Sequence, residues 1–168
     1  MWNDIESPLA YLITFRCHGT WLHGDERGSV DRFHNHYNSP YIEPSRQWYR
    51  YNRTILRGEP VKLTASRRAS VETAIRETCN LRNWFLHAIN VRTNHVHAVV
   101  SIGSLAPQRA LSGFKANATR HMRHDGCWVQ ERSPWVVKGS VRYLWNERSV
   151  TLAIDYVING QGNDLPEF

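Results

Sequence analysis

The chain has 168 residues, long enough to bury the core of one domain, and its seven Trp, seven Tyr and five Phe argue against disorder. Lys and Arg number 21 against 15 Asp and Glu, a formal charge of +6 that favours a polyanionic partner such as nucleic acid but also fits a merely basic surface. No segment has the roughly 18 apolar residues of a membrane span or the core of a signal peptide, and the three scattered cysteines do not fit a disulfide framework. We therefore expect a cytoplasmic protein with no membrane partner, folded as a single domain over residues 1–168.

A strand and a long irregular segment come first in the chain. Residues 11–17 alternate with the two-residue period of a half-buried strand. Over residues 18–62 glycines and prolines interrupt every periodicity, which predicts a long insertion, and loops of that length are usually functional. A helix is predicted over residues 64–81, where apolar side chains recur every three to four positions and Thr64 or Ser66 could cap the start.

The rest of the chain predicts a hairpin, two helices and one more strand. Strand-like runs at 84–91 and 95–102 have hairpin spacing, and a helix follows at about 105–124. A short strand fits residues 140–145, and a last helix spans about 149–158. The order strand–helix–strand–strand–helix–strand is that of a ferredoxin-like sandwich, an α+β fold with an antiparallel sheet and helices on one face. The last helix is appended to this fold.

Two histidines stand two residues apart in the strand predicted at 95–102. Because strand side chains alternate between two faces, His95 and His97 project together from the face opposite the apolar side chains that should pack on the helices. Neighbouring neutral imidazoles are good ligands for a divalent metal. Two ordinary surface histidines explain the pair equally well when it is taken alone. A second pair, His34 and His36, lies in the insertion without a strand pattern and is interpreted as incidental.

Tyr156 on the last helix is a candidate nucleophile. The apolar stripe of that helix centres near Val150, Ile154 and Val157, and at about 100° per residue Tyr156 falls more than roughly 90° from this centre. A phenol can attack a phosphate that a metal ion polarises. A partly exposed tyrosine without a role is the better explanation if Tyr156 is considered alone, and Tyr143 is a rival only if the last helix is misassigned.

Basic and aromatic residues alternate between residues 45 and 68, where seven Lys and Arg are offset only by Glu59. Cations that hold phosphates and rings that stack on bases bind single strands, at about 1–3 kcal/mol per stacked base. A solvated basic face is an alternative of nearly equal weight. The candidate DNA-binding residues in this segment are Arg46, Trp48, Tyr49, Arg50 and Arg53.

Together these features resemble one family, the single-tyrosine HUH transposases, which include the REP-associated tyrosine transposases. The resemblance rests on residues 94–100, Asn-His-Val-His-Ala-Val-Val, which are similar to that family's strand with its histidine pair and apolar run. It continues through Phe114 and Lys115 on the next helix and through residues 155–159, Asp-Tyr-Val-Ile-Asn, around the tyrosine.

The resemblance implies Mg²⁺ or Mn²⁺ at His95 and His97, and attack by Tyr156 on a phosphodiester of single-stranded or hairpin DNA. The product would be a 5′-phosphotyrosine link and a free 3′-hydroxyl. Because the phosphoester is exchanged rather than hydrolysed, a 3′-hydroxyl can reverse the attack and join strands without ATP. The resemblance also makes Lys115 a candidate DNA-binding residue.

The third metal ligand departs from the pattern of that family. A polar ligand usually stands one turn after the tyrosine, where this chain has Gly160. The alternatives are its neighbours Asn159 and Gln161. We favour Gln161, because the glycines beside it could let its side chain swing toward the metal.

Three functions fit the sequence, and we favour the first. It is a metal-dependent transposase that cuts and rejoins single-stranded DNA. The second is a nickase of the relaxase or replication-initiator kind with the same chemistry, and the third is a non-catalytic module that binds single-stranded nucleic acid. The family that the chain resembles includes dimers in which the tyrosine helix serves the neighbouring subunit, so a homodimer and a monomer both stay open.

Overall fold

The computed structural model describes residues 7–20, 46–47, 50, 59–162 and 165–166. Each helix and strand begins and ends within two residues of the bounds that the sequence predicts. The elements are β1 (Ala10–Arg16), α2 (Ala65–Leu81), β2 (Phe85–Val91), β3 (His95–Ser101), α3 (Pro107–His124), β4 (Ser140–Leu144) and α4 (Glu147–Asn159). The strands form one antiparallel sheet in the order β2-β3-β1-β4, so the predicted ferredoxin-like α+β fold is confirmed.

Side-chain caps begin two of the helices. The Thr64 hydroxyl accepts a hydrogen bond from the backbone N–H of Arg67 at 3.4 Å, so Thr64 rather than Ser66 caps α2. At the start of α4 the amide oxygen of Asn146 accepts from the Ser149 N–H at 2.9 Å. None of the described helices is long and apolar enough to cross a membrane.

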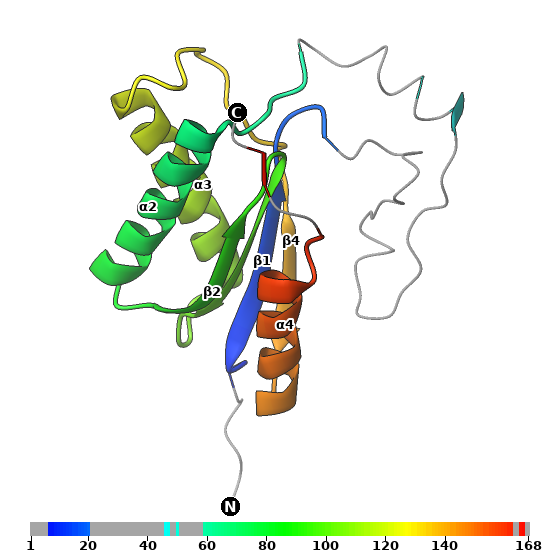
Figure 1. The fold of residues 1–168 in the computed structure, drawn as a ribbon. Helices are drawn as coiled ribbons and strands as arrows, with labels where there is room; N and C mark the ends of the chain where they lie inside the picture. The colour runs from blue at the N-terminus through cyan, green and yellow to red at the C-terminus, as the bar shows by residue number, and fades with distance from the viewer. Residues whose placement is uncertain (1–6, 21–45, 48–49, 51–58, 163–164, 167–168) are drawn as a thin grey trace, which may run out of the picture.

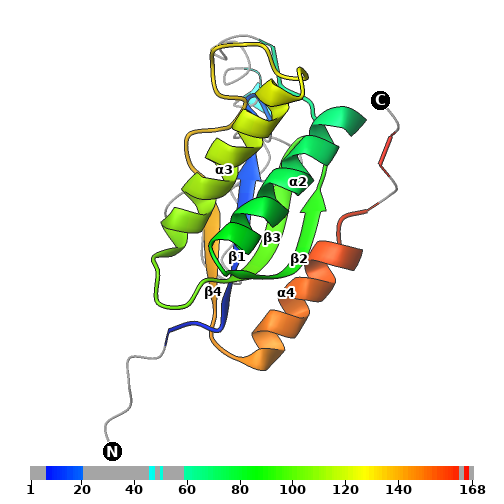
Figure 2. The ribbon, with the colours of Figure 1, turned by 90° about the vertical axis from the view of Figure 1, so that its left-hand side faces the viewer.

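The sheet is covered on both faces, by α2 and α3 on one side and by α4 on the other (Figures 1 and 2). The larger core lies under α2 and α3 and includes Phe15, Val96 and Phe114, all fully buried. A second, smaller cluster fills the space between the other face and α4, with Val99 and Val157 fully buried in it. The histidine pair does lie on the face opposite the larger core, as expected, but this face has a smaller core of its own because α4 folds back onto it.

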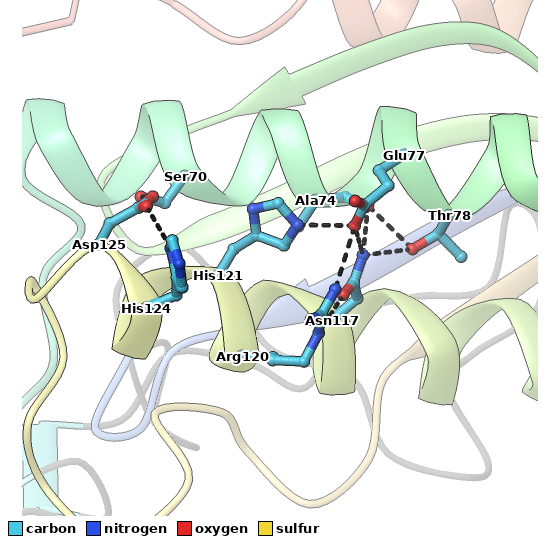
Figure 3. A network of polar contacts seen from close by, with 9 residues as sticks. All are labelled: Ser70, Ala74, Glu77, Thr78, Asn117, Arg120, His121, His124 and Asp125. Atoms are coloured by element: carbon cyan, nitrogen blue, oxygen red, sulfur yellow. Dashed lines mark hydrogen bonds and ion pairs between the residues drawn. The ribbon is translucent and has the colours of Figure 1, made fainter.

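The helix layer is fastened by polar side chains between α2 and α3 (Figure 3). The Glu77 carboxylate accepts hydrogen bonds from Asn117 Nδ2 at 2.8 Å and from His121 Nε2 at 2.6 Å. Near the other end of this contact, the Ser70 hydroxyl donates to the Asp125 carboxylate. These contacts join residues about 40 to 55 positions apart, so they fix how the two helices lie against each other.

The predicted insertion at 18–62 leaves and rejoins the fold at one place. The backbone N–H of Val61 donates to the carbonyl of His18 at 2.8 Å, beside the end of β1. Most of the insertion lies outside the described residues, and so do the candidates Trp48, Tyr49 and Arg53. The single domain over residues 1–168 stays a prediction for the same reason.

Candidate metal and tyrosine site

His97 is held inside the protein by its strand partner. It is only 4% exposed, and its Nδ1 lies 2.7 Å from the hydroxyl of Thr14, the residue opposite it on β1. Its other ring nitrogen, Nε2, is buried and has no hydrogen-bond partner among the described residues. A buried polar atom without a partner is costly, so this nitrogen is suited to bind a ligand.

His95 lies beside His97 on the same face of β3, with the two ring centroids 4.7 Å apart. Its Nδ1 is 2.7 Å from the side-chain oxygen of Asn94, which can only accept, so Nδ1 carries a proton, and in the neutral ring Nε2 is then the nitrogen that could bind a metal ion. That Nε2 faces the amide oxygen of Gln161 at 3.3 Å. With Nδ1–H donating to Asn94 Oδ1 in His95 and to the Thr14 hydroxyl in His97, the Nε2 of each ring is the nitrogen that could bind a metal ion.

Burial keeps His97 neutral. It is the largest cause that lowers the pKa of His97 to about 3; His95, Arg142 and Arg92 act in the same direction, and the Gln161 side chain acts in the opposite one. A neutral imidazole with an unused nitrogen is the form that binds a metal ion.

Tyr156 lies against the histidine pair in the same chain. Its ring centroid is 5.4 Å from that of His97 in an edge-to-face arrangement, and the residue is 43% exposed. Tyr156 belongs to α4. This helix is held in place by the buried side chains of Ala153 and Val157 and by a hydrogen bond of 2.9 Å from Asn90 Nδ2 to the Val157 carbonyl. The phenol is therefore close to the histidines and open to solvent.

Gly160 allows the next residue, Gln161, to lie beside His95. A side chain at this position would bring its Cβ within 2.7 Å of the Tyr156 carbonyl oxygen and 3.1 Å of its ring. Without a side chain here, the chain turns so that Gln161 Nε2 donates to the Tyr156 carbonyl at 2.9 Å while Gln161 Oε1 faces His95. Asn159 is exposed and donates to Asp155 at 2.8 Å, so of the two alternatives it is Gln161 that lies at the histidine pair.

The residues present fit a divalent ion bound by His95, His97 and Gln161. Two imidazole nitrogens and an amide oxygen are suitable donors, and waters and a phosphate could complete the shell. Adjacent donors of an octahedral ion at about 2.1 Å lie roughly 3 Å apart. The separation of 3.3 Å between His95 Nε2 and Gln161 Oε1 is close to that value. Among the described residues, no three His, Cys, Asp or Glu lie together so as to hold a metal ion.

Of the candidate DNA-binding residues, the described part of the chain includes Arg46, Arg50 and Lys115. Arg46 and Arg50 are exposed. Lys115 lies on α3, across the sheet from α4, and its ammonium donates to the carbonyls of Val136 and Lys138 at 2.6 and 2.9 Å. Burial, and then the charge of Arg16, lower the pKa of Lys115 to about 8. The role of these residues in DNA binding stays a prediction.

Two residues that hold the site were not found from the sequence. Thr14 reaches His97 and Asn90 reaches the tyrosine helix, yet each lies more than 60 positions from its partner. The alternation of residues 11–17 does place Thr14 on one face of its strand, but which strand lies beside it depends on the pairing of the whole sheet.

The sequence matches the family model "Transposase IS200 like" over residues 49–151, more than half of the chain. The chain belongs to this family. The matched segment of this IS200-like transposase includes His95 and His97 and ends before Tyr156 and Gln161. No curated protein matches the chain significantly.

One solved structure confirms the fold of this IS200-like transposase. A REP-associated tyrosine transposase bound to a REP hairpin aligns with a TM-score of 0.52 and 11% identity, over 94% of this chain and 68% of that one. A protein from Deinococcus radiodurans described as a "putative transposase" aligns with a TM-score of 0.48 and 11% identity, over 97% of this chain and 98% of that one.

Proposed function

We propose that the protein cleaves and rejoins single-stranded or hairpin DNA, with Tyr156 as nucleophile and with Mg²⁺ or Mn²⁺ held by His95, His97 and Gln161. One observation carries this proposal: the Tyr156 ring lies 5.4 Å from that of His97, whose buried Nε2 has no partner among the described residues. The membership in the IS200-like transposases supports it at the level of the family. The DNA hairpin bound to a similarly folded transposase supports the choice of substrate.

The chemistry is a phosphoester exchange. The Tyr156 oxygen forms a bond to phosphorus as the bond from phosphorus to the 3′ oxygen breaks. The phenol loses its proton and the leaving 3′ oxygen gains one, so a 5′-phosphotyrosine and a 3′-hydroxyl result. A bound divalent ion would supply Lewis-acid polarisation of the phosphate. The residues of this chain hold the tyrosine at the histidines, since Asn90 anchors the Val157 carbonyl and Gln161 bonds the Tyr156 carbonyl.

The test is covalent attachment to labelled hairpin DNA. With Mn²⁺ the wild type should give a product that keeps its reduced mobility on a denaturing gel, and Tyr156→Phe should abolish it while DNA binding is unchanged. Tyr143→Phe is the matched control, because Tyr143 is also exposed but packs edge-on against Tyr11, which belongs to the core under α2 and α3. Adducts that persist in Tyr156→Phe would overturn the choice of nucleophile. Binding without any adduct from the wild type would favour the non-catalytic module.

A further inference from the structure

We propose that Arg142 on β4 binds a backbone phosphate of the single strand, next to the one that is cut, so that the DNA crosses the sheet from the histidine pair toward the β4 edge. This inference rests on the proposed function and adds a residue and a direction to it. Nothing in the sequence pattern alone singled out this arginine.

The strands of the sheet have positive side chains but no negative ones. The four strands contain no Asp or Glu, and their only Arg residues are Arg16 and Arg142. Strand pairing puts both on the histidine face, because Arg16 lies opposite His95 and Arg142 lies opposite Leu12, which packs with Val99. The strand residues on this face therefore offer only positive and neutral groups to a ligand, which suits a polyanion.

Arg142 differs from the residues that lie in line with it on the other three strands, which together form one row across the sheet. Its row partners Leu12, Val99 and Ala88 are buried and apolar under α4, whereas Arg142 is half-buried on the edge strand. The next row is polar on all four strands and contains His97, with Asn90, Thr14 and Ser140 beside it. Arg142 thus borders the polar row that leads away from His97 to the β4 edge of the described sheet.

The guanidinium of Arg142 has no carboxylate partner among the described residues, although it is close enough to His97 to act on its charge. Two strand spacings separate β4 from β3, about 10 Å, which the long arginine side chain partly spans. An arginine binds phosphate through paired N–H donors, and one in the row next to His97 fits a phosphate that neighbours the one to be cut. The other explanation is that Arg142 is an edge charge that blocks sheet-to-sheet pairing.

The salt dependence of binding separates these explanations. Binding of a fluorescent oligothymidylate is measured by anisotropy at several salt concentrations, in EDTA so that no cleavage occurs. One phosphate contact in a single strand contributes about 0.7 to the slope of log affinity against log salt. Arg142→Ala should lower the slope by about that amount and weaken binding about tenfold, whereas Arg142→Lys should keep the slope.

The matched control is Arg148→Ala, an exposed arginine in the first turn of α4, at the opposite end of that helix from Tyr156. It removes the same charge and should leave the slope unchanged. Equal slopes for Arg142→Ala and wild type, or equal losses in both alanine variants, would overturn the proposal. Normal binding with new self-association of Arg142→Ala would also overturn it and support the edge charge.

Two further controls concern the folding of the variants and the dependence of this proposal on the cleavage function. Thermal melting checks that the variants fold, and Arg142→Gln, which keeps most of the side chain, takes the place of the alanine variant if that one melts early. Because binding in EDTA needs no nucleophile, a wild type that binds with the expected slope but forms no adduct would refute the cleavage function and leave the phosphate site standing.

Discussion

Thr14 is the residue on which the metal-binding form of His97 depends. Its hydroxyl is hydrogen-bonded to Nδ1 of His97 at 2.7 Å, so Nε2 is the ring nitrogen that could bind a metal ion. Partners of this kind typically change metal affinity about 10- to 100-fold when they are removed. We expect Thr14→Val, which keeps the shape and loses the hydroxyl, to weaken Mn²⁺ binding by that factor in a calorimetric titration.

Thr14→Ser is the control for that experiment, since it restores a hydroxyl at the same position. It should recover most of the affinity, and both variants should melt near the wild-type temperature if Thr14 acts only through His97. Unchanged Mn²⁺ binding by Thr14→Val would show that His97 does not need this hydrogen bond, or is not a ligand.

At the residue scale the sequence predicted the histidine pair but not its partners. The two-residue period of a strand is enough to put His95 and His97 on one face, because it is a local property. The contact of His97 with Thr14 spans 83 positions, and it exists only because β1 lies between β3 and β4. The distance from Gln161 to His95 depends likewise on where the end of α4 lies over the sheet.

Between the elements α2 and α3, Glu77 makes the stability of the helix layer depend on pH. Its hydrogen bond from Asn117, and then that from His121, lower the pKa of Glu77 below its ordinary value of 4.5. A carboxyl with a lower pKa in the folded chain stabilises the fold above its unfolded pKa, and this contribution is lost as the pH falls through the folded value. We expect Glu77→Gln to unfold at lower urea concentration than wild type near neutral pH.

The difference between Glu77→Gln and wild type should shrink as the pH falls below about 4.5, where Glu77 of the unfolded chain takes up a proton, and should vanish below the lower folded pKa, where the folded carboxyl is protonated as well. Glu72→Gln is the control: Glu72 is exposed and bonds only Arg76 within the same helix. If both variants unfold alike at neutral pH, Glu77 does not join the two helices.

At the element scale the helices and strands were predictable, and the faces they bury were only partly so. Apolar periodicity gave the bounds because it reflects the pattern of burial along each segment. For α4 it gave a stripe centred near Val150, Ile154 and Val157, of which Val157 is fully buried and the other two are only partly buried. An apolar stripe on a helix predicts that this face is buried, but it does not predict which surface the face packs against.

On the scale of the molecule, the two layers differ in size. The layer under α2 and α3 contains 22 buried residues of the described chain, whereas the layer under α4 contains seven. Local opening follows the amount of apolar surface that holds an element in place. The tyrosine helix is therefore the element that should open most readily, and with it Tyr156 and Gln161 would leave the histidine pair.

Hydrogen exchange followed by mass spectrometry measures this difference directly. We expect the amides of α4 to exchange before those of β1 and β3. Val157→Ala removes part of a fully buried side chain from the small cluster, at a cost of about 2 kcal/mol, and should speed exchange in α4 by at least about tenfold while the sheet stays protected. Val71→Ala, an equally buried valine in α2, should instead speed exchange of the most protected sheet amides and leave α4 unchanged. Exchange of α4 and the sheet at one common rate in all three proteins would mean that the tyrosine helix opens only when the whole molecule unfolds.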